Sequence, residues 1–395
     1  MTNEMKNVPE LRFPGFEGEW RLINLKNCFH TIKNGFVGTA TPFYTDNSGV
    51  RYLQSNNVKN GFLNDNVKIY VTKEFNEKYK SNQLKSGDML MVQSGHAGAT
   101  AVVSDAYEGS NCHALIIMKP KSNINTVFLN NYFQSGKGVK SIYSLITGNT
   151  IKHILSSDVK KITFSTPVIG EQEKIGDFFS KLDRQIELEE QKLSLLEGQK
   201  KGYMQKLFSQ ELRFKDQDGN DYPKWEKKFI KDIFIFENNR RKPITSSLRE
   251  KGLYPYYGAT GIIDYVKDYL FNNEERLLIG EDGAKWGQFE KSSFIANGQY
   301  WVNNHAHVVK SNNHNLYFMN YYLNFKELRT FVTGNAPAKL THANLCNINL
   351  EIPCLNEQGK ISALLKSIDK KMNNQINKIV LLKRRKQGLL QKMFV

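Results

Sequence analysis

The chain has 395 residues, of which 40% are hydrophobic and 12% aromatic, so its composition is that of a folded protein of two or three domains. A net charge of +16 favours a polyanionic partner such as nucleic acid. The mean hydropathy of -0.51, the absence of any apolar run near the ~18 residues of a membrane span, and the lack of a signal pattern predict a cytoplasmic protein with no membrane role. The four cysteines are isolated, which argues against a disulfide framework and a zinc ribbon.

Residues 1–168 form the first predicted domain, which has mixed α/β character. Short β-rich runs such as Met89–Gln93 and Ala114–Met118 alternate with turns rich in Gly, Asn, Asp and Ser. The loops carry basic, amide and hydroxyl side chains, which are the groups that bind phosphates and base edges in DNA. The candidate DNA-binding residues of this domain are Lys33, Asn34, Gln54, Asn56, Gln93, Ser94 and His96.

Residues 169–208 are predicted to form one long helix. Apolar side chains recur at alternating steps of four and three, the heptad pattern of a helix that pairs with another helix. A proline-free helix of about 37 residues is ~55 Å long at 1.5 Å per residue. The apolar positions of this seam are Ile175, Phe179, Leu182, Ile186, Leu193, Leu196 and Leu207.

Residues 209–354 form a second mixed α/β domain, again rich in polar loops. Lys and Arg reach guanine or phosphate, whereas Asn and Gln pair with adenine. A histidine or a polar residue in a loop is more often structural than functional. Each residue of this domain is therefore weighed separately as a candidate for contact with DNA. The candidates are Arg240, Arg241, Lys242, Tyr256, Tyr257, Thr260, Lys285, Trp286, Gln288, His305 and His307.

Residues 355–395 repeat the first helix. Thr147-Gly148-Asn149 matches Thr333-Gly334-Asn335 at an offset of 333 − 147 = 186, and the same offset holds without a gap as far as Phe208 and Phe394. Two matched seams predict that the helices pair with each other, although the charges do not decide between parallel and antiparallel packing. The second seam consists of Ile361, Leu365, Ile368, Met372, Ile379, Leu382 and Met393.

Catalytic and metal-binding signatures are weak. The chain has neither the glycine-rich loops of nucleotide-binding proteins nor a recognisable nucleophile motif. Asp221, Glu226 and Lys228 imitate a metal-dependent nuclease pattern, but such a pattern is common by chance in a lysine-rich chain. We therefore expect no catalytic residue and no metal site.

The whole chain resembles the specificity subunits of type I restriction-modification enzymes. The resemblance rests on the repeated segments Pro167–Asp183 and Pro353–Asp369, and on the repeated ends Gly202–Phe208 and Gly388–Phe394. The repeated openings Glu10–Phe13 and Glu211–Phe214 add to it.

This resemblance implies an α/β (α+β) fold with two globular target-recognition domains, 1–168 and 209–354. They would be separated by two long helices, 169–208 and 355–395, that form an antiparallel coiled coil in a tandem pseudo-two-fold repeat. Each domain would read one half of a bipartite asymmetric site in double-stranded DNA. Two modification (methyltransferase) subunits and the restriction (translocase and nuclease) subunits would dock on this chain. Those partners, and not this chain, would bind S-adenosylmethionine, ATP and Mg²⁺.

Two other functions remain as alternatives. A single-chain DNA nuclease with its own recognition domains would need a metal site, for which Asp221, Glu226 and Lys228 are the poor candidates. A basic coiled-coil scaffold that binds an acidic protein would show affinity that ignores DNA sequence.

Overall fold

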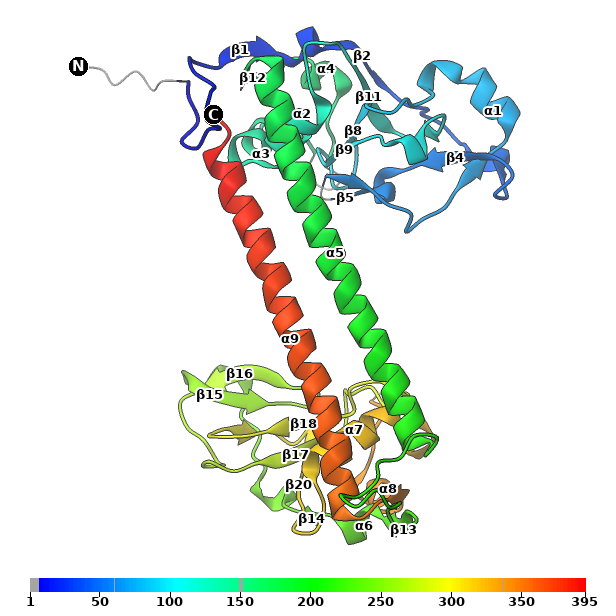
Figure 1. The fold of residues 1–395 in the computed structure, drawn as a ribbon, viewed down its shortest axis with the longest axis vertical. Coiled ribbons are helices and arrows are strands. Elements are labelled where there is room, and N and C mark those ends of the chain that lie inside the picture. The colour runs from blue at the N-terminus through cyan, green and yellow to red at the C-terminus, as the bar shows by residue number, and fades with distance from the viewer. Residues whose placement is uncertain (1–6, 60, 149–151, 336) are drawn as a thin grey trace, which may run out of the picture. The chain divides into compact units, whose positions relative to one another are not determined.

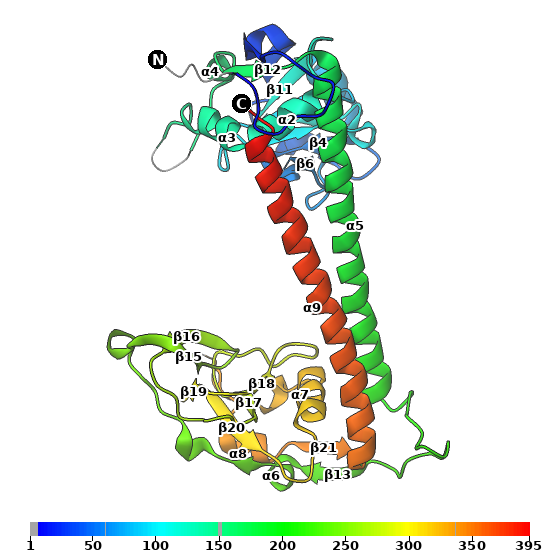
Figure 2. The ribbon, with the colours of Figure 1, turned by 60° about the vertical axis from the view of Figure 1, so that its left-hand side comes forward.

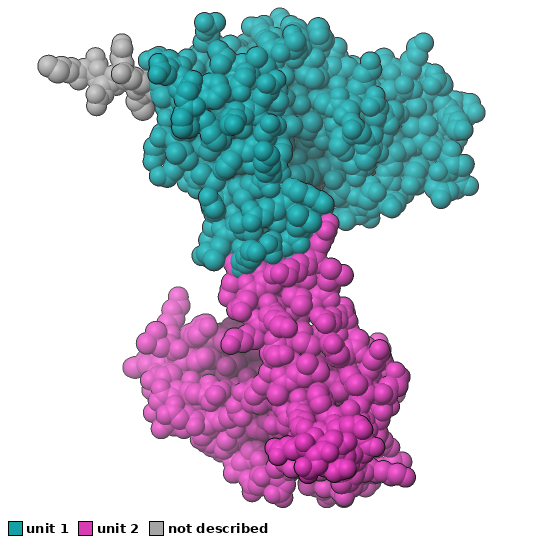
Figure 3. All heavy atoms as spheres, viewed as in Figure 1, with its two compact units in different colours: residues 1–190, 378–395 teal, residues 191–377 magenta. Residues whose placement is uncertain are grey.

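A computed structural model describes residues 7–59, 61–148, 152–335 and 337–395, so Asn149 of the repeated tripeptide lies outside the described residues. The chain divides into two compact units (Figure 3). Unit 1 comprises residues 1–190 and 378–395, and unit 2 comprises residues 191–377. Each unit therefore contains one globular part together with a part of each long helix, whereas the sequence suggested four consecutive segments.

The globular part of unit 1 contains twelve strands and four short helices within the described ranges. The strands are β1 (Arg21–Asn24), β2 (Phe29–Asn34), β3 (Tyr44–Thr45), β4 (Val50–Leu53), β5 (Val58–Lys59), β6 (Phe62–Leu63), β7 (Tyr70–Val71), β8 (Met89–Val92), β9 (Thr100–Val102), β10 (Asn111–Cys112), β11 (Leu115–Pro120) and β12 (Thr163–Thr166). The helices are α1 (Lys73–Lys78), α2 (Thr126–Gln134), α3 (Gly136–Tyr143) and α4 (Ser156–Val159). The long helix α5 (Ile169–Phe208) follows and continues into unit 2.

The globular part of unit 2 repeats this order with fewer elements. Its strands are β13 (Glu226–Phe229), β14 (Ile235–Phe236), β15 (Lys251–Tyr257), β16 (Ile262–Val266), β17 (Arg276–Gly280), β18 (Ser293–Ala296), β19 (Trp301–Val302), β20 (Ala306–Lys310) and β21 (Asn349–Ile352). Its helices are α6 (Ile230–Ile233), α7 (Leu316–Phe325) and α8 (His342–Cys346), and the long helix α9 (Leu355–Lys392) follows. In the described part of the chain no helix combines the length and apolar character needed to span a bilayer.

The two globular parts share one topology. Unit 1 has an antiparallel sheet of order β2-β11-β8-β9, and unit 2 has the corresponding order β14-β20-β17-β18. In each unit a second sheet contains a parallel pair, β4 with β10 and β15 with β19. The tandem repeat and the α+β fold predicted from the sequence are therefore confirmed, and the repeat extends through the segments whose sequences diverge.

A short antiparallel pair closes each globular part at the start of its long helix. Strand β1 pairs with β12, with Arg21 opposite Thr166 (Figure 1), and β13 pairs with β21, with Glu226 opposite Ile352 (Figure 2). A buried tryptophan precedes each pair: Trp20 packs against Phe394, and Trp225 packs against aromatic rings of α7. The two ends of each globular part therefore lie side by side.

The long helices pack antiparallel within each unit, as Figures 1 and 2 show. In unit 1 the Lys386 ammonium lies 2.7 Å from the Asp183 carboxylate, and in unit 2 the Lys200 ammonium lies 2.6 Å from that of Asp369. Asp183 and Asp369 are equivalent positions of the repeat, as are Lys200 and Lys386. The same pair of equivalent residues therefore meets in each unit, as an antiparallel pairing of the two helices requires. The antiparallel pairing implied by the resemblance is confirmed.

The seam residues also attach the helices to the globular parts. Ile175, Phe179 and Leu182 belong to the core of unit 1 together with residues of α2, and Ile361 and Leu365 belong to the core of unit 2 with residues of α7. Near the middle of the helices Leu193 and Leu196 remain partly exposed. The seam residues near the helix starts therefore pack on a globular part.

The repeated Glu-Gln pair is structural. Glu171 and Glu357 are fully buried, and each accepts two hydrogen bonds from one arginine, Arg12 at 2.7 and 2.8 Å and Arg213 at 2.7 and 3.1 Å. The adjacent glutamines hold the N-termini of α2 and α7, since Gln172 accepts from the Asn125 N–H and Gln358 from the Asn315 N–H, both at 2.9 Å. These contacts fix each globular part to the start of its long helix.

The residues after α5 have a counterpart at the other end of the sequence. The Leu212 N–H donates to the Lys206 carbonyl, and the Leu11 N–H donates to the Lys392 carbonyl, each at 2.9–3.0 Å. Lys206 and Lys392 are equivalent positions of the repeat. The N-terminal segment therefore packs on the end of α9 in the way that the connected chain packs on the end of α5.

Candidate nucleic-acid interface

In unit 1 the candidate residues follow the ends of the strands. Lys33 and Asn34 end β2, whereas Gln93 and Ser94 follow β8. The Lys33 ammonium lies 3.1 Å from the Ser81 hydroxyl, and burial together with the neighbouring Lys119 lowers the pKa of Lys33. Among the described residues the buried side-chain oxygen of Asn34 has no hydrogen-bond partner. The end of β2 therefore combines a half-buried lysine with a buried acceptor that has no partner among the described residues.

The loop after β8 is braced by a residue that the sequence analysis missed. The His153 Nδ1 atom forms a 2.6 Å hydrogen bond with the Ser94 hydroxyl, and its Nε2 atom lies 3.4 Å from the Gln93 amide nitrogen. Gln93 is buried, so its side chain supports the loop, whereas His96 is exposed. Gln54 is half-buried beside the Tyr44 hydroxyl and Asn56 is exposed.

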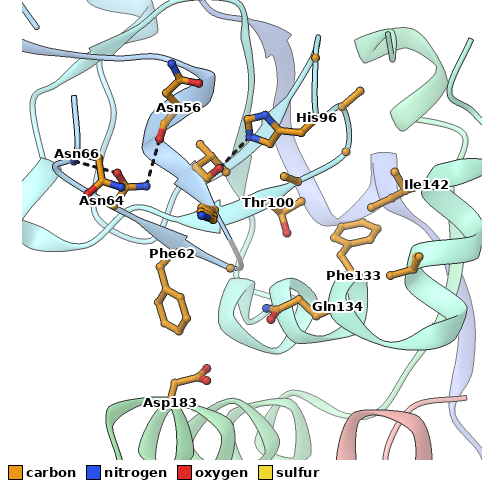
Figure 4. A pocket seen from close by; sticks show the side chains of 18 of the residues that line it. Asn56, Phe62, Asn64, Asn66, His96, Thr100, Phe133, Gln134, Ile142 and Asp183 are labelled. Atoms are coloured by element: carbon orange, nitrogen blue, oxygen red, sulfur yellow. Dashed lines mark hydrogen bonds between the residues drawn. The ribbon is translucent and has the colours of Figure 1, made fainter. Parts of the chain in front are cut away.

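A cleft of about 1290 Å³ lies in unit 1 beside these loops. Asn56 and His96 line it together with Lys59 and Lys152, and its opposite wall contains residues of α5 and α9. Figure 4 shows Phe62 extending from β6 towards Asp183 of α5. The cleft thus brings the candidates Asn56 and His96 next to two lysines, Lys59 and Lys152.

In unit 2 five candidates hold the loops together through contacts within the protein. The Arg240 guanidinium binds both Glu274 oxygens at 2.7 and 2.8 Å, and Arg241 binds Glu281 at 2.7 Å and the Ala306 carbonyl at 3.0 Å. The other three are buried and make hydrogen bonds to the backbone: Tyr256 with Ile244, Trp286 with Gly280, and His307 with Leu340. Tyr256, Trp286 and His307 therefore lie in the interior, whereas Arg240 and Arg241 stay partly exposed, at 32% and 16%, with their guanidinium groups paired to carboxylates. Tyr257 is half-buried against Phe294 and Tyr300.

The exposed candidates of unit 2 are Lys242, Thr260, Lys285, Gln288 and His305. His305 lies 2.5 Å from Asp282 in the loop after β17, and Asp282 also pairs with Lys339 at 3.3 Å. The Trp301 indole N–H donates a hydrogen bond to the Lys242 backbone carbonyl at 2.6 Å. Thr260 lies in the turn between β15 and β16, and Gln288 follows the β17 loop. The sequence analysis missed two residues here, Asp282 and Lys339, and Lys339 occupies the same repeat position as His153.

The nuclease pattern does not assemble into a metal site. Glu226 is exposed on β13 and pairs with Lys228 at 3.3 Å, while Asp221 forms a backbone bridge with Lys215. Across the described ranges, no cluster of three or more His, Cys, Asp and Glu side chains suits a metal ion.

The contrast between Lys242 and Arg241 gives a first prediction. Lys242→Ala should lower DNA affinity for all sequences and reduce the slope of log affinity against log salt by about 1, with little change in stability. Arg241→Ala should lower the free energy of unfolding by about 1–3 kcal/mol, because it removes charged hydrogen bonds of a largely buried group. Thermal unfolding and DNA-binding titrations of both variants measure this; equal stability losses would contradict the distinction.

A second prediction concerns the stability of the fold at acidic pH. Hydrogen bonds from Arg240, followed by the charges of Arg240 and Arg276, lower the pKa of Glu274 to about 2 from 4.5. A lowered folded-state pKa stabilises the fold above pH 4.5, and this contribution is lost as the pH falls towards 2. Glu274→Gln should therefore be less stable than the original chain at pH 7, and the difference should shrink below pH 4.5. Urea unfolding between pH 3 and 7 tests this; a difference independent of pH would contradict it.

Comparison with known proteins agrees with this geometry. The family model for the type I restriction modification DNA specificity domain matches residues 17–198 and 222–381, so the chain belongs to this family. Its function is that of a specificity subunit, the noncatalytic DNA-recognition component of a type I restriction-modification system.

Individual relatives support the assignment over different lengths. A protein named as a type I restriction enzyme specificity subunit from Haemophilus influenzae is 41% identical over 148 residues, which is 36% of this chain and 37% of that protein. The MjaX specificity subunit of Methanocaldococcus jannaschii is 22% identical over 93% of this chain and 88% of its own. The crystal structure of the S subunit from M. genitalium has the same fold, with a TM-score of 0.64 at 16% identity over 98% of this chain and 99% of that one.

Proposed function

We propose that each globular part reads one half of a bipartite, asymmetric site in double-stranded DNA. The observation that supports this is the shared topology of the two parts combined with unlike loops at equivalent places. Ser94 follows β8 in unit 1, whereas Asp282 occupies the matching position after β17 in unit 2. One scaffold with two sets of loop side chains suits two different half-sites, since base contacts specify and the scaffold positions them.

The helix pair acts as the spacer in this proposal. Helix α5 has 40 residues, which corresponds to about 60 Å at 1.5 Å per residue. A duplex turn is ~34–36 Å, so a helix of this length suits two short half-sites separated by an unread gap. Phosphate contacts of a chain with net charge +16 supply affinity that falls with salt.

In this proposal partner subunits catalyse the methylation and the restriction of DNA. Two modification subunits dock on the repeated helix segments and methylate adenine, with S-adenosylmethionine bound to them. Restriction subunits that use ATP and Mg²⁺ join the same complex. This chain binds none of these cofactors and directs methylation or restriction to its site.

Selection from a random DNA pool tests the proposal. The complex of this chain with its modification subunits is expected to enrich duplexes that share two unlike short blocks at one fixed separation. The modification subunits without this chain provide the control and should enrich no common sequence. Enrichment of one continuous block, or of none, would contradict the two-reader proposal.

A further inference from the structure

The two long helices carry different charges although they repeat one another. Helix α9 has ten Lys and Arg residues against two acidic residues, Glu357 and Asp369, whereas α5 has seven against eight. Glu357 pairs with Arg213 and Asp369 pairs with Lys200, so both carboxylates of α9 are balanced by cations outside that helix. A surplus of positive charge therefore belongs to α9 alone.

Part of this surplus is paired with α5. In unit 1 Lys383 lies 2.6 Å from Glu190, and Lys386 lies 2.7 Å from Asp183. A third lysine, Lys378, also pairs with a glutamate of α5. These cations contribute to the contact between the two helices, so they are already engaged within the protein.

Four further cations of α9 are exposed, namely Lys370, Lys371, Arg384 and Arg385. Among the described residues none of these four side chains has an ion pair, a hydrogen bond or a contact with an aromatic ring. Lys370 and Arg384 are two heptads apart, as are Lys371 and Arg385, so the two pairs recur on one face of the helix, outside the apolar seam. The lysine pair belongs to unit 2 and the arginine pair to unit 1.

The repeat is broken at these four positions. At the offset of 186 they correspond to Arg184, Gln185, Gly198 and Gln199 of α5. Arg184, the one cation in that set, pairs with Glu187 at 2.6 Å. Two identical partner subunits docked on the two repeats would meet the same side chains on both helices, so they do not account for a basic face that only α9 has.

We infer that this face of α9, through Lys370 and Lys371 in unit 2 and Arg384 and Arg385 in unit 1, binds phosphate groups of the DNA between the two half-sites. The inference rests on the proposed function and gives the spacer helix a second role. Lys and Arg are the side chains that bind phosphates, and these four can do so without breaking an ion pair. Because the phosphate backbone is the same for every sequence, such contacts hold the gap without reading it.

Neutral substitutions in the full complex with the modification subunits test the inference. One variant combines Lys370→Gln with Lys371→Gln, another combines Arg384→Gln with Arg385→Gln, and a fourfold variant contains all of them. Each pair should reduce the slope of log affinity against log salt by about 2, and the fourfold variant should reduce it by about 4. Affinity for the selected duplex should fall roughly tenfold for each pair at low salt, with the methylated motif unchanged.

Two control variants accompany these substitutions. Lys192→Gln with Lys201→Gln removes the same charge from two exposed lysines of α5 and should leave the salt slope unchanged. Lys370→Arg with Lys371→Arg retains the charge and should keep the original affinity. Because all of these side chains are exposed, the melting temperature should stay the same in every variant.

A duplex with neutral methylphosphonate groups in place of the gap phosphates locates the contact. The unaltered complex should bind this duplex roughly a hundredfold more weakly than the ordinary one, which is the effect of the fourfold substitution. The fourfold variant should bind both duplexes equally, since the contact is already lost. Equal binding of both duplexes by the unaltered complex would overturn the inference.

The other outcomes are also decisive. An unchanged salt slope overturns the inference, and so does a changed methylated motif, which would assign these residues to base reading. Loss of a partner subunit with DNA affinity intact would make the face a protein-docking surface and overturns it as well. If the unaltered complex selects a split sequence without any contribution from the gap phosphates, the inference fails alone. If it selects no split sequence, the proposed function fails and the inference with it.

Discussion

Exchanging residues 20–166 for the corresponding segment of a specificity subunit with another target should change one half of the methylated motif and leave the other half unaltered. The junctions fall where β1 and β12 pair, with Arg21 opposite Thr166, so the exchanged piece enters and leaves at one place. The helix α5 begins after this segment and remains complete, so the gap should also stay the same. Because each altered base pair costs about 1–3 kcal/mol, methylation of the former sites should be lost.

The matched control is the exchange of residues 226–352, which are closed by β13 and β21. It should change the other half only. Mapping of methylated adenines in cells that express each hybrid with the modification subunit provides the measurement. A change in both halves after one exchange would show that the two globular parts do not read independently.

The second large effect is expected from Arg213→Ala. This change leaves the fully buried Glu357 carboxylate with the Trp225 indole, at 3.2 Å, but without its cation. Breaking a buried ion pair on one side costs about 3–5 kcal/mol. Because a quarter of the Arg213 side chain is exposed, we expect about 2–3 kcal/mol, or roughly 5–10 °C in the melting temperature.

Two variants control this prediction. Arg12→Ala removes the equivalent contact of unit 1 and should destabilise the protein to a similar extent. Arg184→Ala removes an exposed pair with Glu187 and should change stability by less than about 0.5 kcal/mol. Calorimetry of the three variants tests the order, and a melting temperature of Arg213→Ala equal to that of Arg184→Ala would contradict it.

The helices and the repeat could be predicted because their signals are local or periodic. The seam repeats every seven residues, and the offset of 186 is visible in the sequence alone. The antiparallel direction of the helix pair could not be predicted from the sequence, because it depends on which lysine meets which aspartate. In the structure Lys386 meets Asp183 and Lys200 meets Asp369.

The roles of individual loop residues could not be predicted, because their partners are distant in sequence. Arg240 meets Glu274 and Arg241 meets Glu281, 34 and 40 residues further along the chain. An arginine in a polar loop has the same local sequence whether it contacts a carboxylate or a phosphate. The repeat offset makes His153 and Lys339 equivalent, but only the fold shows that they bridge Ser94 and Asp282 in the loops after β8 and β17.

The central claim, that this chain supplies two-part sequence specificity, is tested most directly by mapping methylated adenines in cells that contain the modification subunit with and without this chain. We expect a new split motif of two unlike halves around a fixed gap, present only when the chain is expressed. An unchanged methylation map, with the assembled complex demonstrated, would contradict the account.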